Sequence, residues 1–139
     1  MDQFNRTLAR WEPMVLSIFR IMVGLLLFQY GIAKILKYPV LPYFANIPPL
    51  ITTAGALELI LGALLILGLF TRLSAFILSG EMAFAYFMGH MFKAGVGAPV
   101  LIPLLNGGNA AILFCFACLY LACAGGGVWS VDAMMRRRA

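Results

Sequence analysis

Four long apolar runs dominate this sequence, and ionisable side chains lie inside three of them. The runs cover approximately residues 14–36, 50–70, 73–92 and 109–124. A helix of about 20 apolar residues spans the ~30 Å hydrocarbon layer of a bilayer, and the first three runs have that length. We therefore predict an all-α fold. Residues 1–139 are expected to form a single transmembrane domain, a four-helix bundle with short interfacial helices at both termini.

Composition and charge favour a membrane environment. Hydrophobic residues make up 63% of the chain and charged residues 11%, whereas about a quarter of the residues in a soluble domain are charged. The net charge of +5 comes from basic residues at the ends of the apolar runs. They form no basic stripe with interleaved aromatic residues, so nucleic acid is excluded as a partner and membrane lipid is expected.

The distribution of Lys and Arg predicts how the chain is oriented. Basic flanks are retained on the cytoplasmic side of a bacterial-type inner (plasma) membrane. The first apolar run is long and no small-residue cleavage motif follows it, so we expect it to be retained as a helix. Both termini of this multi-pass protein should then be cytoplasmic. Six arginines lie on the predicted inner side, against Lys37, Lys93 and the boundary residue Lys34 on the other: Arg6, Arg10, Arg72, Arg136, Arg137 and Arg138.

Charged groups inside a membrane need partners, a cavity or a route to the interface. At a rise of 1.5 Å per residue, Arg20 and Glu81 lie at similar depths in the inner half, and we predict that they pair. Lys34 and Glu58 lie in the outer half and are predicted to form a second pair. Such pairs serve either as structural ties between helices or as parts of a polar pocket. His90 is expected near the outer end of the third helix.

Helical spacing predicts which faces point inward. Arg20, Gly24, Gly31 and Lys34 share one stripe, and a second stripe is formed by Gly55, Glu58, Gly62 and Leu65. Both should face the bundle interior. Glu81 and His90 are nine residues apart and fall on opposite faces of an ideal helix. The third helix is therefore expected either to bend near Gly89 or to use His90 against a partner surface, such as another copy of the chain.

The cysteines and the histidine limit which cofactors are plausible. Cys115 and Cys118 form a Cys-x-x-Cys pattern, but the pattern lies inside an apolar helix and favours small packing residues over a redox pair. No second pair of ligands accompanies it, so no metal site is predicted. One histidine cannot supply two axial ligands to haem, and the sequence has no dinucleotide-binding fingerprint. Electrons for any redox reaction would have to come from a partner.

Several of these landmarks together resemble the DoxX family of small four-helix membrane proteins. The first matching feature is the set Arg20, Gly24, Gly31 and Lys34 in the first apolar run. The second is Glu58 with the apolar block that ends at Arg72, and the third is the ending Gly-Gly-Gly-Val-Trp-Ser-Val-Asp132. The family takes its name from a membrane subunit of a thiosulfate:quinone oxidoreductase. The resemblance therefore implies quinone-linked redox chemistry or defence against thiol stress. Asn109 stands where a carboxylate would be expected, which argues against proton transfer at that position.

Two functional hypotheses follow. In the first, the chain is the membrane subunit of a redox system, and a quinone or similar small apolar molecule binds near Lys34, Glu58 and His90. The enzyme would then be completed by a partner redox subunit. In the second, the chain is a non-catalytic membrane scaffold or a small-solute transporter, and both charge pairs are structural. Homo-oligomerisation is compatible with either hypothesis.

Overall fold

The computed structural model describes residues 1–92 and 101–138, and all the regular secondary structure in these residues is helical. Two long helices come first, and a π-helix continues the third. The elements are α1 (Asp2–Ile35), the short 3-10 helix η1 (Pro42–Phe44), α2 (Pro49–Leu67), α3 (Thr71–Phe84), the π-helix η2 (Ala85–Met91), α4 (Pro103–Asn106), α5 (Asn109–Ala124) and α6 (Val131–Arg138). Lys93 lies outside the described residues.

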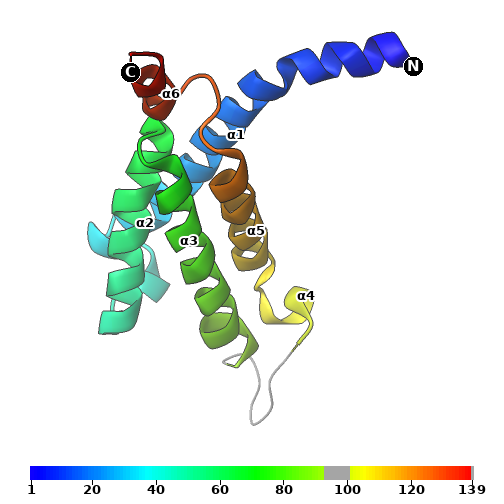
Figure 1. Ribbon diagram of the computed structural model, residues 1–139. Coiled ribbons are helices and arrows are strands. Elements are labelled where there is room, and N and C mark those ends of the chain that lie inside the picture. The colour runs from blue at the N-terminus through cyan, green and yellow to red at the C-terminus, as the bar shows by residue number, and fades with distance from the viewer. Residues whose placement is uncertain (93–100, 139) are drawn as a thin grey trace.

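The helices pack as two closely associated pairs. The most extensive contacts join α1 to α2 and α3 to α5, and α2 also packs on α3. Figure 1 shows both chain termini at one end of the molecule, with α4 and the end of η2 at the other. The buried core lies between the pairs and is built from Leu27, Leu65, Leu78 and Leu121, each fully buried. The α2 and α3 helices form a tight hairpin through residues 68–70.

The N-terminal helix differs from the prediction. A separate interfacial helix was expected before residue 14, but α1 is continuous from Asp2 and contains Pro13. A single proline removes one backbone hydrogen bond and bends a helix more readily than it ends one. The first turns of α1 are exposed and extend away from the other helices (Figure 1). The expected C-terminal helix is present as α6, and Ser130 caps it by accepting a hydrogen bond from the Ala133 amide at 3.1 Å.

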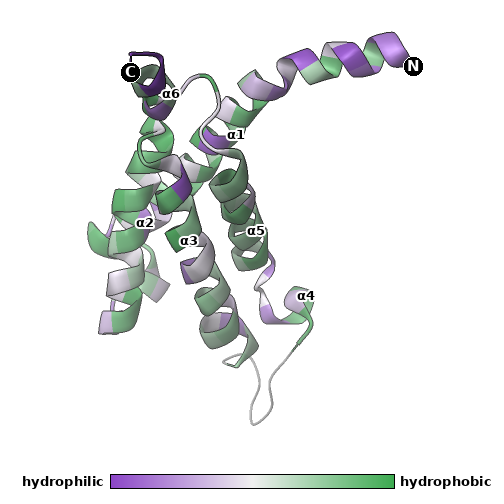
Figure 2. Cartoon of the chain, viewed as in Figure 1, coloured by the Kyte–Doolittle hydropathy of each residue, from purple (hydrophilic) through white to green (hydrophobic). Residues whose placement is uncertain are grey.

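Most apolar side chains of the long helices face outward. Within the described residues, α1 and α2 are long and apolar enough to cross a membrane, yet only 33% and 22% of their most apolar windows are buried. The α5 helix is apolar but shorter. Figure 2 shows hydrophobic residues along the middle of the helices and hydrophilic ones in the first turns of α1 and in α6. Helices that are apolar all round suit a lipid environment.

Glycine residues allow α1 and α2 to approach closely. A Cβ atom on Gly62 would lie 2.9 Å from the Phe28 backbone nitrogen, and one on Gly24 would lie 2.9 Å from that of Ile66. A Cβ on Gly31 would overlap the backbone of Leu59. The two predicted glycine stripes therefore do face each other, and backbone atoms that cannot move aside fill the space beside them.

This packing predicts different effects for two glycine substitutions. Gly31→Ala should destabilise the protein by at least the 1–3 kcal/mol typical of overpacking, because the new methyl group meets backbone. Gly80→Ala is the matched control, since nothing lies within 4 Å of a Cβ at this helical position. It should leave stability unchanged or raise it by up to about 1 kcal/mol. Unfolding of both variants in the same detergent would test this, and equal effects would contradict the packing.

Candidate functional site

Arg20 is fully buried and is bound by backbone carbonyl groups. Its Nε donates to the Gly126 carbonyl at 2.8 Å and its Nη2 to that of Trp129 at 2.6 Å. The remaining contacts are from Nη1 to the carbonyls of Leu65 and Ile66, in the last turn of α2. Carbonyl groups in the last turn of a helix lack intrahelical partners and carry partial negative charge. Arg20 thus stabilises the end of α2 and joins it to the segment before α6.

The predicted Arg20–Glu81 pair is therefore wrong. Similar depth along the helices predicted a charged partner for Arg20, but carbonyl groups at helix ends can accept the same hydrogen bonds. Asp132 is the acidic residue whose charge acts on Arg20. Arg20 has no described hydrogen bond or ion pair with Lys34, Glu58 or Glu81.

The glycine-rich segment before α6 has the geometry that this binding requires. Gly125 and Gly127 adopt positive φ angles of 89° and 75°, which favour glycine. A Cβ on Gly126 would lie 2.8 Å from the Ser130 Cβ. Close by, the Ser17 hydroxyl of α1 accepts a hydrogen bond from the Trp129 amide at 3.1 Å. Gly127 is thus explained by its close approach to α1, since a Cβ there would lie 2.9 Å from the Ser17 backbone nitrogen, and Gly126 by its approach to Ser130.

Asp132 closes the same end of the molecule by capping α3. Its two carboxylate oxygens accept hydrogen bonds from the backbone amides of Phe70, at 2.9 Å, and Thr71, at 2.8 Å. Partial burial alone would raise the pKa of Asp132. The hydrogen bonds from Thr71 and Phe70, with the positive charge of Arg136, outweigh it and hold the pKa below its usual value. An ionised carboxylate at the N-terminus of a helix is favoured by the helix dipole.

Removal of this cap gives a second prediction. Asp132→Ala should destabilise the fold by about 1 kcal/mol, the usual cost of losing a helix cap. Because folding lowers the pKa of Asp132, its contribution is fully present at neutral pH and is lost as the pH falls through the folded-state value. The stability difference between the wild type and Asp132→Ala should therefore shrink on acidification. A pH series of unfolding midpoints measures it, with Asp2→Ala as the control, and a difference independent of pH would contradict the capping role.

Lys34 and Glu58 form the ion pair predicted from the sequence. The Lys34 Nζ donates to both carboxylate oxygens of Glu58, at 2.8 and 2.7 Å. The side chains are 12% and 3% exposed respectively, so the pair is shielded from solvent. Gly55 makes room for it, because a Cβ there would lie 2.7 Å from the Lys34 Cβ. The glycine stripes thus explain why the two charges meet.

Aromatic rings and the η1 segment lie beside this pair. The Lys34 Nζ lies 5.9 Å from the centre of the Tyr30 ring and 5.7 Å from that of Phe44. Such cation–π contacts stabilise an ammonium group in apolar surroundings. The η1 segment is held in turn by Lys37, whose Nζ donates to the Phe44 carbonyl at 2.7 Å. Lys34 is therefore surrounded by one carboxylate and two aromatic faces.

Glu81 belongs with this pair and not with Arg20. Its charge interacts with those of Glu58 and Lys34, and also acts on Cys118 of α5. One of its carboxylate oxygens, Oε2, is buried and has no hydrogen-bond partner among the described residues. A buried oxygen of this kind is costly unless something binds it. The charged cluster therefore contains Lys34, Glu58 and Glu81, and the sequence-based prediction assigned its third member to Arg20 instead.

His90 lies in the π-helix and faces a different element. Its Nδ1 is 3.1 Å from the carbonyl oxygen of Asn106, at the end of α4. The Asn106 amide donates to the Tyr86 hydroxyl at 3.3 Å. A π-helix shifts the phase of the side chains that follow it, and this change from α3 to η2 resolves the expected conflict between Glu81 and His90. No described contact joins His90 to Lys34 or Glu58.

The two cysteines of the Cys-x-x-Cys pattern pack against the core. Cys118 is fully buried and Cys115 partly buried, and neither forms a disulfide. The Ser79 hydroxyl donates to the Cys115 carbonyl at 2.8 Å and joins α3 to α5. No group of His, Cys, Asp and Glu residues suited to a metal ion is found in residues 1–92 and 101–138.

These features define a small helical protein with membrane-type helices and a shielded charged cluster. The model of the family named DoxX matches residues 15–91, which include Arg20, Lys34, Glu58 and Glu81. The chain belongs to the DoxX family. A protein of Haemophilus influenzae (strain ATCC 51907 / DSM 11121 / KW20 / Rd) is 40% identical over 128 residues, which cover 90% of this chain and 93% of that protein, and it is described as uncharacterized. None of the solved structures matches the chain.

Proposed function

We propose that this DoxX protein is the membrane subunit of a quinone-linked oxidoreductase or redox-stress system. In this proposal it binds a quinone or a similar small apolar carbonyl compound beside Lys34, Glu58 and Glu81. The chain crosses the inner membrane four times, with both termini in the cytoplasm, and a partner redox subunit supplies the electrons. No complete enzyme activity is proposed for the chain alone.

The apolar surface and the positions of the basic residues support this topology. The fourth crossing is α5, and α3 runs directly into η2, which lengthens the third helical segment to residues 71–91. Both termini lie at one end of the molecule (Figure 1). Arg72 lies at the same end, where it donates to the carbonyl groups of Ala122 and Cys123 in the last turn of α5. Basic residues concentrated at one end favour a cytoplasmic position for that end.

The unsatisfied carboxylate oxygen of Glu81 beside the Lys34–Glu58 pair carries the functional proposal. An ammonium group has three N–H donors, and Lys34 uses two on Glu58. The third is suited to a carbonyl oxygen of a quinone, where a positive charge stabilises the negative charge that develops on reduction. Two electrons from the partner and two protons complete the conversion to a quinol. Glu81 and Glu58 are the groups in position to hold those protons.

His90 is proposed to exchange protons with water at the outer end of the third helix. It is partly exposed, and its ring nitrogen lies close to the Asn106 carbonyl. An imidazole ring has two nitrogens and can accept a proton on one and release a proton from the other, which suits it to this exchange. The structure gives it no described contact with the charged cluster, so its role is separate from ligand binding.

The rival proposal is a non-catalytic scaffold or small-solute transporter with structural charge pairs. The mutual hydrogen bonds of Lys34 and Glu58 favour it, because both carboxylate oxygens of Glu58 are already bound. Replacing both partners of a buried ion pair by apolar residues is often neutral or stabilising, whereas removing one partner costs about 3–5 kcal/mol. Single and double variants of the pair can therefore distinguish a loss of stability from a loss of ligand binding.

The test compares single and double variants of the pair. Lys34→Met and Glu58→Gln should each lower stability and lose bound quinone, since each leaves one buried charge unpaired. Lys34→Met/Glu58→Met should recover most of the stability and still lack quinone. Asp2→Asn, which changes an exposed carboxylate at the other end, should match the wild type. The measurements are thermal unfolding and quinone extracted from protein purified in native lipid nanodiscs.

Two results would overturn the redox proposal. One is a stable double variant that retains as much quinone as the wild type. The other is the absence of quinone from the wild-type protein and from its co-purifying complex, with stability following the charge pair alone. Either result would favour the scaffold or transporter.

A further inference from the structure

An open groove lies at the end of the molecule that carries both termini, away from the charged cluster. Its volume is about 380 Å³, and a second hollow of about 230 Å³ shares Glu12 and Leu16 with it. The first is formed between α1, the end of α5, the glycine-rich segment and α6. Its lining includes the charged residues Glu12, Arg136 and Arg137 and the apolar residues Leu16, Val128 and Ala133. The second extends along α1 past Val15 and Phe19 to Tyr120 of α5.

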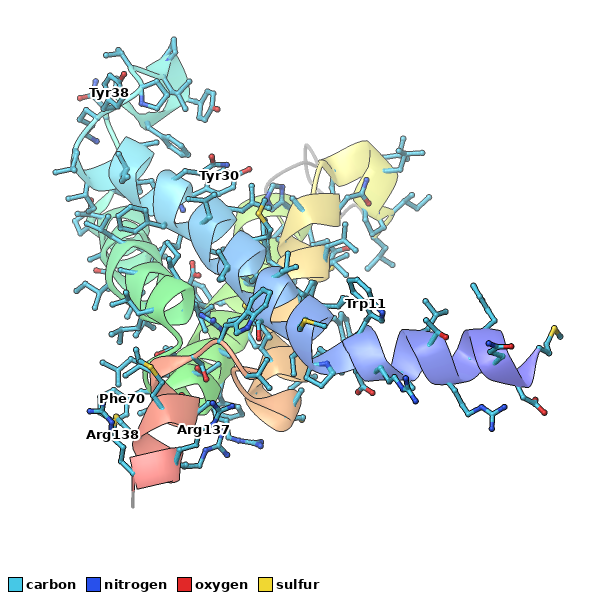
Figure 3. All side chains as sticks on the ribbon, turned by 90° about the horizontal axis from the view of Figure 1, so that it is seen from above. Trp11, Tyr30, Tyr38, Phe70, Arg137 and Arg138 are labelled. Carbon is cyan, nitrogen blue, oxygen red and sulfur yellow. The ribbon has the colours of Figure 1, made fainter. Side chains whose placement is uncertain are left out.

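The groove brings opposite charges together without pairing them. Glu12 comes from α1, and Arg136 and Arg137 come from α6. In the described part of the chain, the only ion pair is Lys34–Glu58, and none of these three side chains forms a hydrogen bond. Figure 3 shows Arg137 and Arg138 on opposite sides of α6, and Arg138 does not line the groove. Two guanidinium groups and one carboxylate therefore face a shared space without described hydrogen bonds, and the charge of Arg136 also acts on nearby Asp132.

We propose that this groove binds a phosphatidylethanolamine molecule. Arg136 and Arg137 hold its phosphate, and the Glu12 carboxylate accepts hydrogen bonds from its ammonium group. Planar guanidinium groups recognise phosphate by paired hydrogen bonds. One acyl chain lies in the adjoining apolar hollow against Val15, Phe19 and Tyr120. The inference rests on the proposed membrane topology, in which this end of the molecule lies at the level of the cytoplasmic headgroups.

The charge pattern selects ethanolamine over other common headgroups. A purely anionic headgroup would satisfy the two arginines but would place its negative charge near Glu12. A choline headgroup carries a positive charge but has no N–H to donate to the Glu12 carboxylate. Basic pockets at the cytoplasmic ends of transmembrane helices are known to bind lipid headgroups, and the acidic residue here is what sets the preference.

Lipid retention in defined nanodiscs tests the proposal. Protein is placed in nanodiscs with equal amounts of phosphatidylethanolamine, phosphatidylglycerol and phosphatidylcholine, and the lipids that stay bound after gentle release are identified by native mass spectrometry. The wild type should retain phosphatidylethanolamine preferentially. Arg136→Gln/Arg137→Gln should reduce retention by about tenfold or more. Arg138→Gln is the matched control and should behave as the wild type does.

The Glu12→Gln variant provides the sharper test. It keeps both arginines but removes the acceptor for the ammonium group, so the preference should shift from phosphatidylethanolamine to phosphatidylglycerol. Wild-type protein that retains phosphatidylglycerol equally well or better, or a preference unchanged in Glu12→Gln, would overturn the inference. The lipid measurement uses neither quinone nor a defined membrane orientation. Its failure is therefore distinguishable from the failure of the quinone test on the Lys34 and Glu58 variants.

Discussion

The structure depends on how a buried guanidinium group at Arg20 is satisfied. A charge in an apolar interior is costly unless nearly all of its donors find acceptors. Here the acceptors are backbone carbonyl groups from the last turn of α2 and from the segment between α5 and α6. Of these carbonyl groups, that of Leu65 also accepts a hydrogen bond from the Gly68 amide, and the others have no further described partner. One side chain from α1 therefore fixes the positions of two other parts of the chain.

Other contacts at the same end extend this arrangement. Arg72 binds the last carbonyl groups of α5, and Asp132 caps the first turn of α3. Each of three helix ends is thus completed by a charged side chain from another element. This end is held by bonds to the backbone, whereas the opposite end contains the Lys34–Glu58 pair and the unsatisfied oxygen of Glu81. The charges that bind the backbone are thus separated along the molecule from the cluster of Lys34, Glu58 and Glu81.

The sequence predicted features that follow from periodicity but not those that depend on backbone acceptors. The glycine stripes and the Lys34–Glu58 pair were predictable because residues on facing stripes at equal depth must meet. The partner of Arg20 was missed because a carbonyl group carries no residue-type signal. Glu81 was wrongly assigned as the partner of Arg20 for the same reason. The position of His90 depends on a π-helix, which residue spacing alone does not predict. The continuation of α1 through Pro13 shows that one proline did not end this helix, which the sequence pattern alone could not decide.

The most direct measurement is backbone hydrogen exchange in an Arg20→Lys variant held in lipid nanodiscs. Lysine keeps the charge but lacks the fork of donors that reaches carbonyl groups on two elements. The account predicts that protection is lost at the amides of Trp129, Asp132, Phe70 and Thr71, while amides around Lys34 and Glu58 keep the wild-type pattern. Wild-type protection at Trp129 and Asp132 in this variant would contradict the central role of Arg20.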